Sequence, residues 1–288
     1  MTNLKDCLEK ILKTFPPVNR VHADPVKFQR KFYELKKSQT EIEAVALFSA
    51  MLAYGSASQF TKKIQTIVEK CNYEFLKLIT EEPQKDFPWV GYRMSTAEEI
   101  SIFAYSIGRV INKYSSIKNV FLEGYNKNHS TKEGLIELRN SIMAEAEKQV
   151  SPVPHGIKHL LPDPSSNGCC KRWHMFLRWM VRGEDGVDLG FWKEVPTSDL
   201  IIPLDTHIGK ISRNIGLTSR KADDWKTAVE ISEKLKECCK EDPIKYDFAL
   251  CHLGISGKCS HGKDKELCEK CMLSEHCVYG KELNNKKK

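Results

Sequence analysis

One carboxylate in the sequence is placed where it could act chemically. Residues 201–208 read Ile-Ile-Pro-Leu-Asp-Thr-His-Ile, so an apolar segment delivers Asp205 to the start of a helix. Ile208, Ile211 and Ile215 recur at offsets of three and seven, which predicts the apolar face of that helix. Asp205 is a candidate catalytic acid, but it could also only cap the free N–H groups and stabilise the helix by about 1 kcal/mol. This stretch alone favours the capping role.

A basic helix is predicted just before this stretch, over residues 169–182. One face carries large apolar side chains and the opposite face carries side chains that can be cationic. The apolar face holds Trp173, Phe176, Leu177 and Met180, and the basic face holds Lys171, His174, Arg178 and Arg182. Both a solvated face on a packed helix and an anion-binding face fit this pattern. The place of Lys171 in the first turn favours an anion, because the helix dipole disfavours a cation there and favours phosphate.

Four of the eleven cysteines form a motif near the end of the chain. Cys259, Cys268, Cys271 and Cys277 are separated by eight, two and five residues. A Cys-x2-Cys pair brings two thiolates to one metal from a single tight turn, and the flanking cysteines complete a site with four ligands. The motif therefore predicts a metal site. Spacing alone leaves zinc and an iron–sulfur cluster both open.

Composition narrows the class of protein. At 288 residues and 41% hydrophobic content, the chain can build a substantial core as one large domain or two small ones. No apolar run approaches the roughly 18 residues of a membrane span, and no signal peptide begins the chain, so a cytoplasmic location is expected. The net charge of +7, part of it in Lys286, Lys287 and Lys288, permits a polyanionic partner.

The elements that must position these side chains are all predicted to be helices. No strand-like alternation, hairpin signal or internal repeat is present, so the fold class is all-α. The segment 41–54 is apolar nearly all round and predicts a buried central helix. A proline-rich connector spans 152–168, and the first forty residues hold one amphipathic helix. Further helices are expected over 57–71, 96–114, 132–149 and 221–240, and from Pro243 onward.

Taken together, these features resemble the helix–hairpin–helix DNA glycosylases of the endonuclease III superfamily, in particular an uncharacterised bacterial and archaeal branch. The resemblance rests on the turn at 160–162, on Lys171 in the helix after it, on residues 204–208 and on the cysteine motif. It covers roughly residues 41–279. The chain departs from the family where 161–168 reads Leu-Pro-Asp-Pro-Ser-Ser-Asn-Gly instead of Leu-Pro-Gly-apolar-Gly, and where the first cysteine gap is eight instead of six.

The resemblance implies specific roles for the candidate residues. Asp205 would be the catalytic carboxylate, and Lys171 the nucleophile that forms a Schiff base with the sugar. Cationic neighbours, His174 and Arg178, are expected to lower the pKa of Lys171. The four cysteines would hold a [4Fe–4S] cluster, with zinc as the alternative. Phosphate contacts would come from Arg172, Arg178, Arg182, Lys210, Arg213 and the C-terminal lysines.

The same resemblance implies an architecture and an activity. A six-helix barrel over 41–192 would face a cluster domain made of 1–40 and 193–288, with the active site in the cleft between them. The protein would be a monomeric repair enzyme, in the cytoplasm at the nucleoid, or in the nucleus if it is eukaryotic. It would be a DNA glycosylase and AP lyase that excises an oxidised base, 8-oxoguanine or an oxidised pyrimidine, from a nucleotide flipped out of duplex DNA. The alternatives are a monofunctional mismatch or adenine glycosylase that uses Asp205 alone, and a non-catalytic DNA-binding iron–sulfur module.

Overall fold

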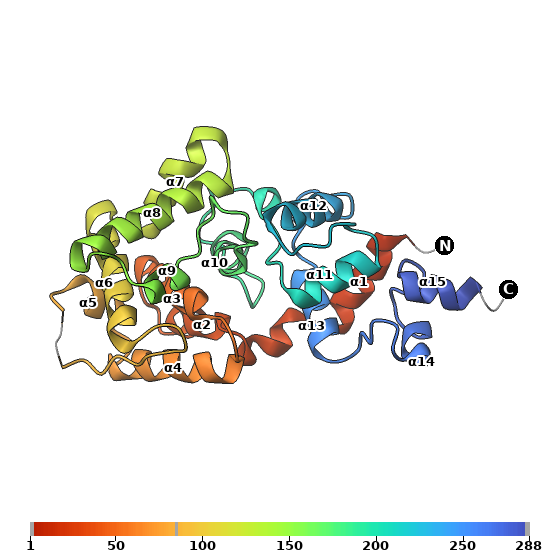
Figure 1. Cartoon of the computed structure of the whole chain (residues 1–288), viewed down its shortest axis with the longest axis horizontal. Coiled ribbons are helices and arrows are strands. Elements are labelled where there is room, and N and C mark those ends of the chain that lie inside the picture. Colours follow the sequence, from red (N-terminus) through yellow and green to blue (C-terminus); the bar gives the residue numbers. More distant parts are fainter. Residues whose placement is uncertain (1–2, 84–85, 286–288) are drawn as a thin grey trace. The chain divides into compact units, whose positions relative to one another are not determined.

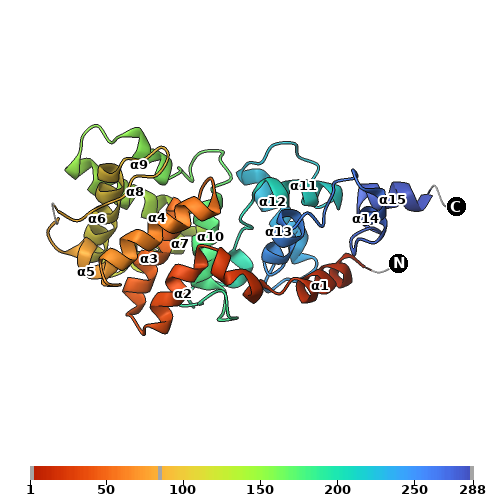
Figure 2. The same ribbon diagram turned by 90° about the horizontal axis from the view of Figure 1, so that it is seen from below.

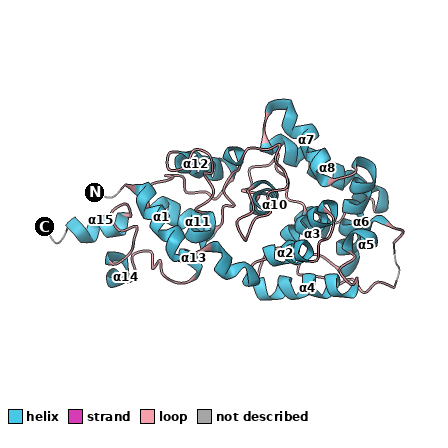
Figure 3. Cartoon of the chain, turned by 180° about the vertical axis from the view of Figure 1, so that it is seen from behind, coloured by secondary structure: helices cyan, strands magenta, loops and turns pink. Residues whose placement is uncertain are grey.

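The computed structural model of the chain describes residues 3–83 and 86–285, and the regular elements in these ranges are helices (Figures 1 and 3). The all-α prediction is confirmed. No helix in the described ranges is long and apolar enough to cross a membrane. The α-helices are α1 (Leu4–Thr14), α2 (Val26–Glu34), α3 (Gln39–Leu52), α4 (Ala57–Lys70), α5 (Phe75–Thr80), α6 (Ala97–Tyr114), α7 (Ile117–Asn128), α8 (Thr131–Gln149), α9 (His155–Leu160), α10 (Lys171–Val181), α11 (Thr206–Asn214), α12 (Trp225–Lys236), α13 (Asp247–Ile255), α14 (Lys265–Glu269) and α15 (Val278–Asn285). Short 3-10 helices lie at η1 (Pro17–Ala23) and η2 (Thr197–Asp199).

Polar side chains fix where several helices begin. Ser38, Thr96 and Ser130 each accept a hydrogen bond from the backbone amide three residues further on, at the starts of α3, α6 and α8. At α6 the carboxylate of Glu99 also reaches back to the amide of Thr96, which completes a capping box. These caps explain why the three helices begin close to the positions that the sequence pattern predicts.

One compact unit consists of the described residues of 20–166 together with 175–194. Helix α3 lies at its centre, where α2, α4, α5, α6 and α7 pack around it (Figures 1 and 2). Phe48 of α3 contacts Phe75 and Phe103, with ring centroids 5.0 and 5.9 Å apart. The prediction of a buried central helix is therefore confirmed.

A second compact unit consists of residues 3–19, 167–174 and 195–285. Here α11 packs against α13, which also packs against α1. Ile208 and Ile211 of α11 are almost fully buried, as their spacing predicts. This unit holds both the start of α10 and the whole of α11.

The compact units divide the chain differently from the predicted domains 41–192 and 1–40 plus 193–288. Residues 20–40 belong to the unit built around α3, because α2 packs against α3. Residues 167–174 belong to the unit that contains α11. Lys171 and Asp205 thus lie within one unit rather than in two facing domains.

Other elements differ from the sequence-based expectation. The first forty residues hold a second α-helix, α2, which buries Phe28 and Phe32. The last long helix, α13, begins at Asp247 and not at Pro243, because the intervening residues form turns. A short helix, α14, also forms inside the cysteine segment, for which the sequence pattern predicts no helix.

Candidate functional site

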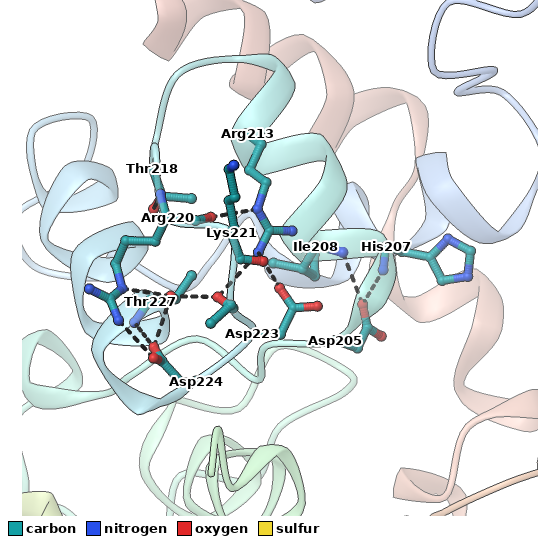
Figure 4. Close-up of polar contacts among 11 residues, drawn as sticks. Asp205, His207, Ile208, Arg213, Thr218, Arg220, Lys221, Asp223, Asp224 and Thr227 are labelled. Atoms are coloured by element: carbon teal, nitrogen blue, oxygen red, sulfur yellow. Dashed lines mark hydrogen bonds and ion pairs between the residues drawn. The ribbon is translucent and has the colours of Figure 1, made fainter. Parts of the chain in front are cut away.

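Asp205 occupies the N-cap of α11, where its side chain serves the backbone. Its Oδ1 accepts hydrogen bonds from the amides of His207 and Ile208, both at 2.9 Å (Figure 4). The extended segment before it is buried and is tied to α12, because the amide of Ile202 donates to Oγ of Ser232 at 2.9 Å. The predicted cap is confirmed, and it holds the carboxylate in one orientation.

The second oxygen of this carboxylate faces Lys171. Nζ of Lys171, at the start of α10, lies 2.8 Å from Oδ2 of Asp205. Sγ of Cys251, on α13, lies 3.9 Å from the same oxygen. The lysine side chain keeps 36% of its accessible surface and the aspartate 18%, so the pair is partly buried and still reachable from solvent. The structure thus brings the two predicted catalytic residues together.

The charges of this pair stabilise each other. Burial by itself would lower the pKa of Lys171, but Asp205, Cys251 and Asp247 together raise it above its ordinary value. Burial would raise the pKa of Asp205, yet the ammonium of Lys171 and the amide of Ile208 lower it. The pair therefore rests as an ammonium beside a carboxylate across the neutral pH range.

The expected cationic neighbours do not lower the pKa of Lys171. His174 is only 1% exposed, and burial lowers its pKa to about 3, so the imidazole is neutral at pH 7. Its ring packs against that of Trp225, with centroids 4.8 Å apart. Arg178 is 2% exposed and pairs with the buried Asp188 at 3.2 Å. The prediction that these two residues activate the lysine is wrong, because one is uncharged and the other is neutralised.

The basic face predicted for α10 is also not a solvated surface. Asp188 receives both Arg178 and Arg182, and Arg182 further binds Asp185 at 2.9 Å. These ion pairs fasten the loop after α10 to the helix. The two arginines are therefore engaged inside their own compact unit and do not present a row of charges to a phosphate backbone.

The other predicted phosphate contacts lie in different surroundings. Lys210 is exposed on α11, and Arg172 is half-buried in the first turn of α10. Arg213 donates to the backbone carbonyls of residues 220–222 and to the carboxylate of Asp223, which clamps the loop after α11 (Figure 4). Lys210 is thus the most accessible of the three. The C-terminal lysines 286–288 lie outside the described residues.

A second capping network positions the start of α10. Asp224 caps α12, and its carboxylate binds the amide and hydroxyl of Thr227 and the guanidinium of Arg220 (Figure 4). Burial would raise its pKa, but these donors lower it to about 2. The next amide, that of Trp225, donates to the carbonyl of Asn167 at 3.0 Å. The loop that leads into Lys171 is thereby fastened to the start of α12, a link that the sequence pattern did not reveal.

The four motif cysteines lie near one another. Burial raises the pKa of Cys259, and the nearby Cys271, Cys277 and Cys268 raise it further. Yet among residues 3–83 and 86–285 no three His, Cys, Asp or Glu side chains are grouped as metal ligands. His261 contacts Sγ of Cys259 at 3.5 Å. The donor types fit zinc or iron–sulfur, and a metal at the four cysteines stays a prediction from their spacing.

A family model described as "Protein of unknown function (DUF2400)" matches residues 24–256. No glycosylase family matches, so the resemblance to the endonuclease III superfamily, its uncharacterised branch included, is wrong as a family assignment. That resemblance rested on a few short segments, whereas the matching model spans most of the chain. No curated protein and no solved structure matches.

Proposed function

The chain belongs to the DUF2400 family, and from the geometry of its site alone we propose that it is a DNA glycosylase with AP lyase activity. The observation that carries the proposal is the 2.8 Å contact between Nζ of Lys171 and Oδ2 of Asp205 in a partly buried, partly accessible position. An amine held against a carboxylate can attack an electrophilic carbon while the carboxylate balances positive charge. The substrate would be an oxidised base, 8-oxoguanine or an oxidised pyrimidine, in duplex DNA.

The reaction follows from these two groups. Lys171 rests protonated, so it must first give up a proton, and Asp205 is the nearest acceptor. The amine lone pair then forms a bond to C1′ while the C1′–base bond breaks. The base leaves with that electron pair and takes up the proton that Asp205 received from Lys171, so Asp205 is again a carboxylate. Opening of the sugar ring gives a Schiff base, and removal of a C2′ proton expels the 3′ phosphate. The carboxylate of Asp205 balances the positive charge that develops on the sugar.

The positive charge of the chain supports DNA as the proposed substrate. The chain carries a net charge of +7, and Lys210 is exposed on α11, five positions after Asp205. A nucleotide flipped from the duplex exposes C1′ to a group that could not reach it inside the stack. Such an enzyme would work at the nucleoid or in the nucleus. The arrangement of a six-helix barrel and a cluster domain stays a prediction, and the chemistry does not need it, because both catalytic residues lie in one compact unit.

One observation favours the monofunctional alternative as a second candidate. Because the pKa of Lys171 is raised, its ammonium form dominates, and an ammonium cannot attack C1′. In that case water would be the nucleophile, and Asp205 would activate it and stabilise the developing charge. Lys171 would then serve to keep Asp205 ionised.

Borohydride trapping on duplexes that each carry a single lesion tests the proposal. We expect a covalent adduct on at least one lesion, lost in Lys171→Gln and retained in the control Lys226→Gln, which alters an exposed lysine of the same unit. Base release by Lys171→Gln without a trapped adduct would instead establish the monofunctional reaction. Full activity of Asp205→Asn would overturn the assignment of the carboxylate. DNA binding without release of any base would leave only a binding module.

The four cysteines belong to the proposal only as a prediction from their spacing. A metal centre there would hold the segment around α14 in place, and the proposed reaction does not involve it. Iron and zinc analysis of anaerobically purified protein, together with its visible absorbance, distinguishes an iron–sulfur cluster from zinc and from four free thiols.

A further inference from the structure

We propose that Cys251 is a positioning residue of the Lys171–Asp205 pair. Its thiol holds Oδ2 of Asp205 while the amine of Lys171 leaves that oxygen to react. The inference rests on the proposed function and deepens it, because it names a third side chain of the same site. It concerns a cysteine outside the four-cysteine motif.

The two oxygens of Asp205 have separate partners. Oδ1 accepts from the amides of His207 and Ile208, which remain in place as long as α11 is folded. Oδ2 accepts from Lys171 at 2.8 Å and from Cys251 at 3.9 Å. When the lysine moves toward C1′, the thiol is the donor that remains at Oδ2.

The packing of α13 explains why a thiol stands there. A Cβ atom at Gly254 would lie 2.8 Å from Cβ of His207, so this glycine lets α13 approach the first turn of α11 closely. Cys251 lies three positions before Gly254 on α13, on the same face, and so meets Asp205. Asp247 lies four positions earlier still and contributes to the raised pKa of Lys171. One face of α13 therefore lines the site, together with the starts of α10 and α11.

The thiol matters because a partly buried carboxylate that loses its cation becomes costly to keep ionised. A remaining donor lowers that cost and keeps Asp205 as the carboxylate that the charged sugar requires. A thiol is a weak donor, so it can share the oxygen without displacing the amine at rest. The charged and titratable groups around this carboxylate are Lys171 from α10, His207 from α11, and Cys251 and Asp247 from α13.

The pH dependence of base release tests this role. Cys251→Ala should shift the acid limb of kcat upward by on the order of half a pH unit, because Asp205 protonates more easily without the donor. It should lower kcat several-fold with KM unchanged. Cys251→Ser, which keeps a donor, should restore the wild-type profile. An alanine variant with the wild-type kcat and pH profile, and with unchanged thermal unfolding, would overturn the proposal.

A second measurement does not depend on catalysis. Peptide-resolved alkylation of Cys251 by iodoacetamide reports how the neighbouring charges act on its thiol. Asp205→Asn should accelerate the alkylation several-fold, because removing an adjacent anion makes the thiol more acidic, whereas Lys226→Gln should leave it unchanged. Equal rates in Asp205→Asn and wild type would refute the contact whatever the enzyme does. If Asp205→Asn accelerated the alkylation of Cys251 but the wild-type protein released no base from any lesion, the contact would stand and the proposed reaction would be rejected.

Discussion

Each oxygen of the Asp205 carboxylate is held by a different part of its compact unit. Oδ1 caps α11 by accepting a hydrogen bond from the amide of His207, and Oδ2 accepts hydrogen bonds from Lys171 and Cys251. The capping and the proposed catalytic roles are therefore compatible, because one oxygen serves each. A cap also keeps the carboxylate ionised, since the amides at a helix start favour the negative form.

The sequence could predict the cap but not all the partners of this carboxylate. An aspartate before an apolar helical stripe is a local pattern, and local patterns can be read directly. The pairing with Lys171 spans 34 positions and was reached only through a resemblance that failed as a family assignment. Cys251 and Asp247 could not be predicted, because they reach the site through the packing of α13 on α11.

His174 gives a prediction about stability at acid pH. The pKa of His174 is about 3 in the folded protein and about 6.5 in the unfolded chain. Between these pH values the unfolded chain binds a proton at His174 and the folded protein does not. Above pH 6.5 the titration of His174 does not change the free energy of unfolding. As the pH falls from 6.5 toward 3, it lowers the free energy of unfolding by up to about 1.4 kcal/mol per pH unit. His174→Phe keeps a ring against Trp225 and removes the titration. Urea unfolding between pH 7 and 4 should show that the free energy of unfolding falls less with pH in this variant than in the wild type.

The matched control is His155→Asn, which removes an exposed imidazole. We expect its stability to fall with pH as steeply as that of the wild type. The two ring nitrogens of His174 have no hydrogen-bond partner among the described residues, so the phenylalanine variant should also be at least as stable at pH 7. If the free energy of unfolding of His174→Phe fell with pH as steeply as that of the wild type, the imidazole would have to be charged or solvated in the folded protein.

At the scale of helices, close backbone contacts set the packing of the unit built around α3. A Cβ atom at Gly108 of α6 would lie 1.7 Å from the carbonyl oxygen of Ile79 in α5. Alanine is favoured over glycine inside a helix by about 1 kcal/mol, but this contact forces two backbones apart. We therefore expect Gly108→Ala to lower the free energy of unfolding by about 3 kcal/mol, measured by urea unfolding followed by circular dichroism.

The control for this substitution is Gly183→Ala in the same unit. A Cβ atom there would meet nothing within 4 Å, so its effect should stay within about 0.5 kcal/mol. Equal stabilities of the two variants would mean that α5 and α6 do not approach each other as the structure has them. The comparison separates the helix contact from any general effect of removing a glycine.

Helices were predictable where apolar periodicity and a cap coincide. Helices α3, α6 and α8 combine both signals and begin within about two residues of the predicted positions. Helix α2 was missed because its charged surface residues dominate a short segment, while Phe28 and Phe32 bury its other face. The prediction that the basic face of α10 is open to solvent or to an anion is wrong for Arg178. Periodicity places Arg178 away from the apolar stripe, but the loop carrying Asp188 covers that face.

At the scale of the whole molecule, the resemblance failed although the short segments that carried it were read correctly. Lys171 does stand at a helix start, Asp205 does cap a helix, and the four thiols do lie near one another. Those are properties of local segments, which unrelated families can share. The family match extends over 24–256 and includes α2 to α9, where the short motifs say nothing. Short motifs of this kind therefore identify neither the family nor its function.

The net charge of +7 overstates how many cations could bind the DNA that we propose as the substrate. Arg178 and Arg182 pair with carboxylates, and Arg213 holds a loop, whereas Lys210 is exposed. Each phosphate contact adds about 0.9 to the slope of log binding constant against log salt concentration. Lys210→Gln should therefore reduce the magnitude of that slope by about one for duplex DNA, whereas Arg178→Gln should leave it unchanged.

Fluorescence anisotropy over a salt series, below the unfolding temperature of each variant, makes this comparison. Asp188 keeps Arg182 as a partner when Arg178 is replaced, so the variant is not left with an isolated buried charge. If Arg178→Gln reduced the slope as Lys210→Gln does, the helix face of α10 would have to open onto the phosphate backbone, and the closed ion pairs seen here would belong only to the free protein. If neither variant changed the slope, the +7 charge would act on DNA through other residues, and the surface near Asp205 would not be where the duplex binds.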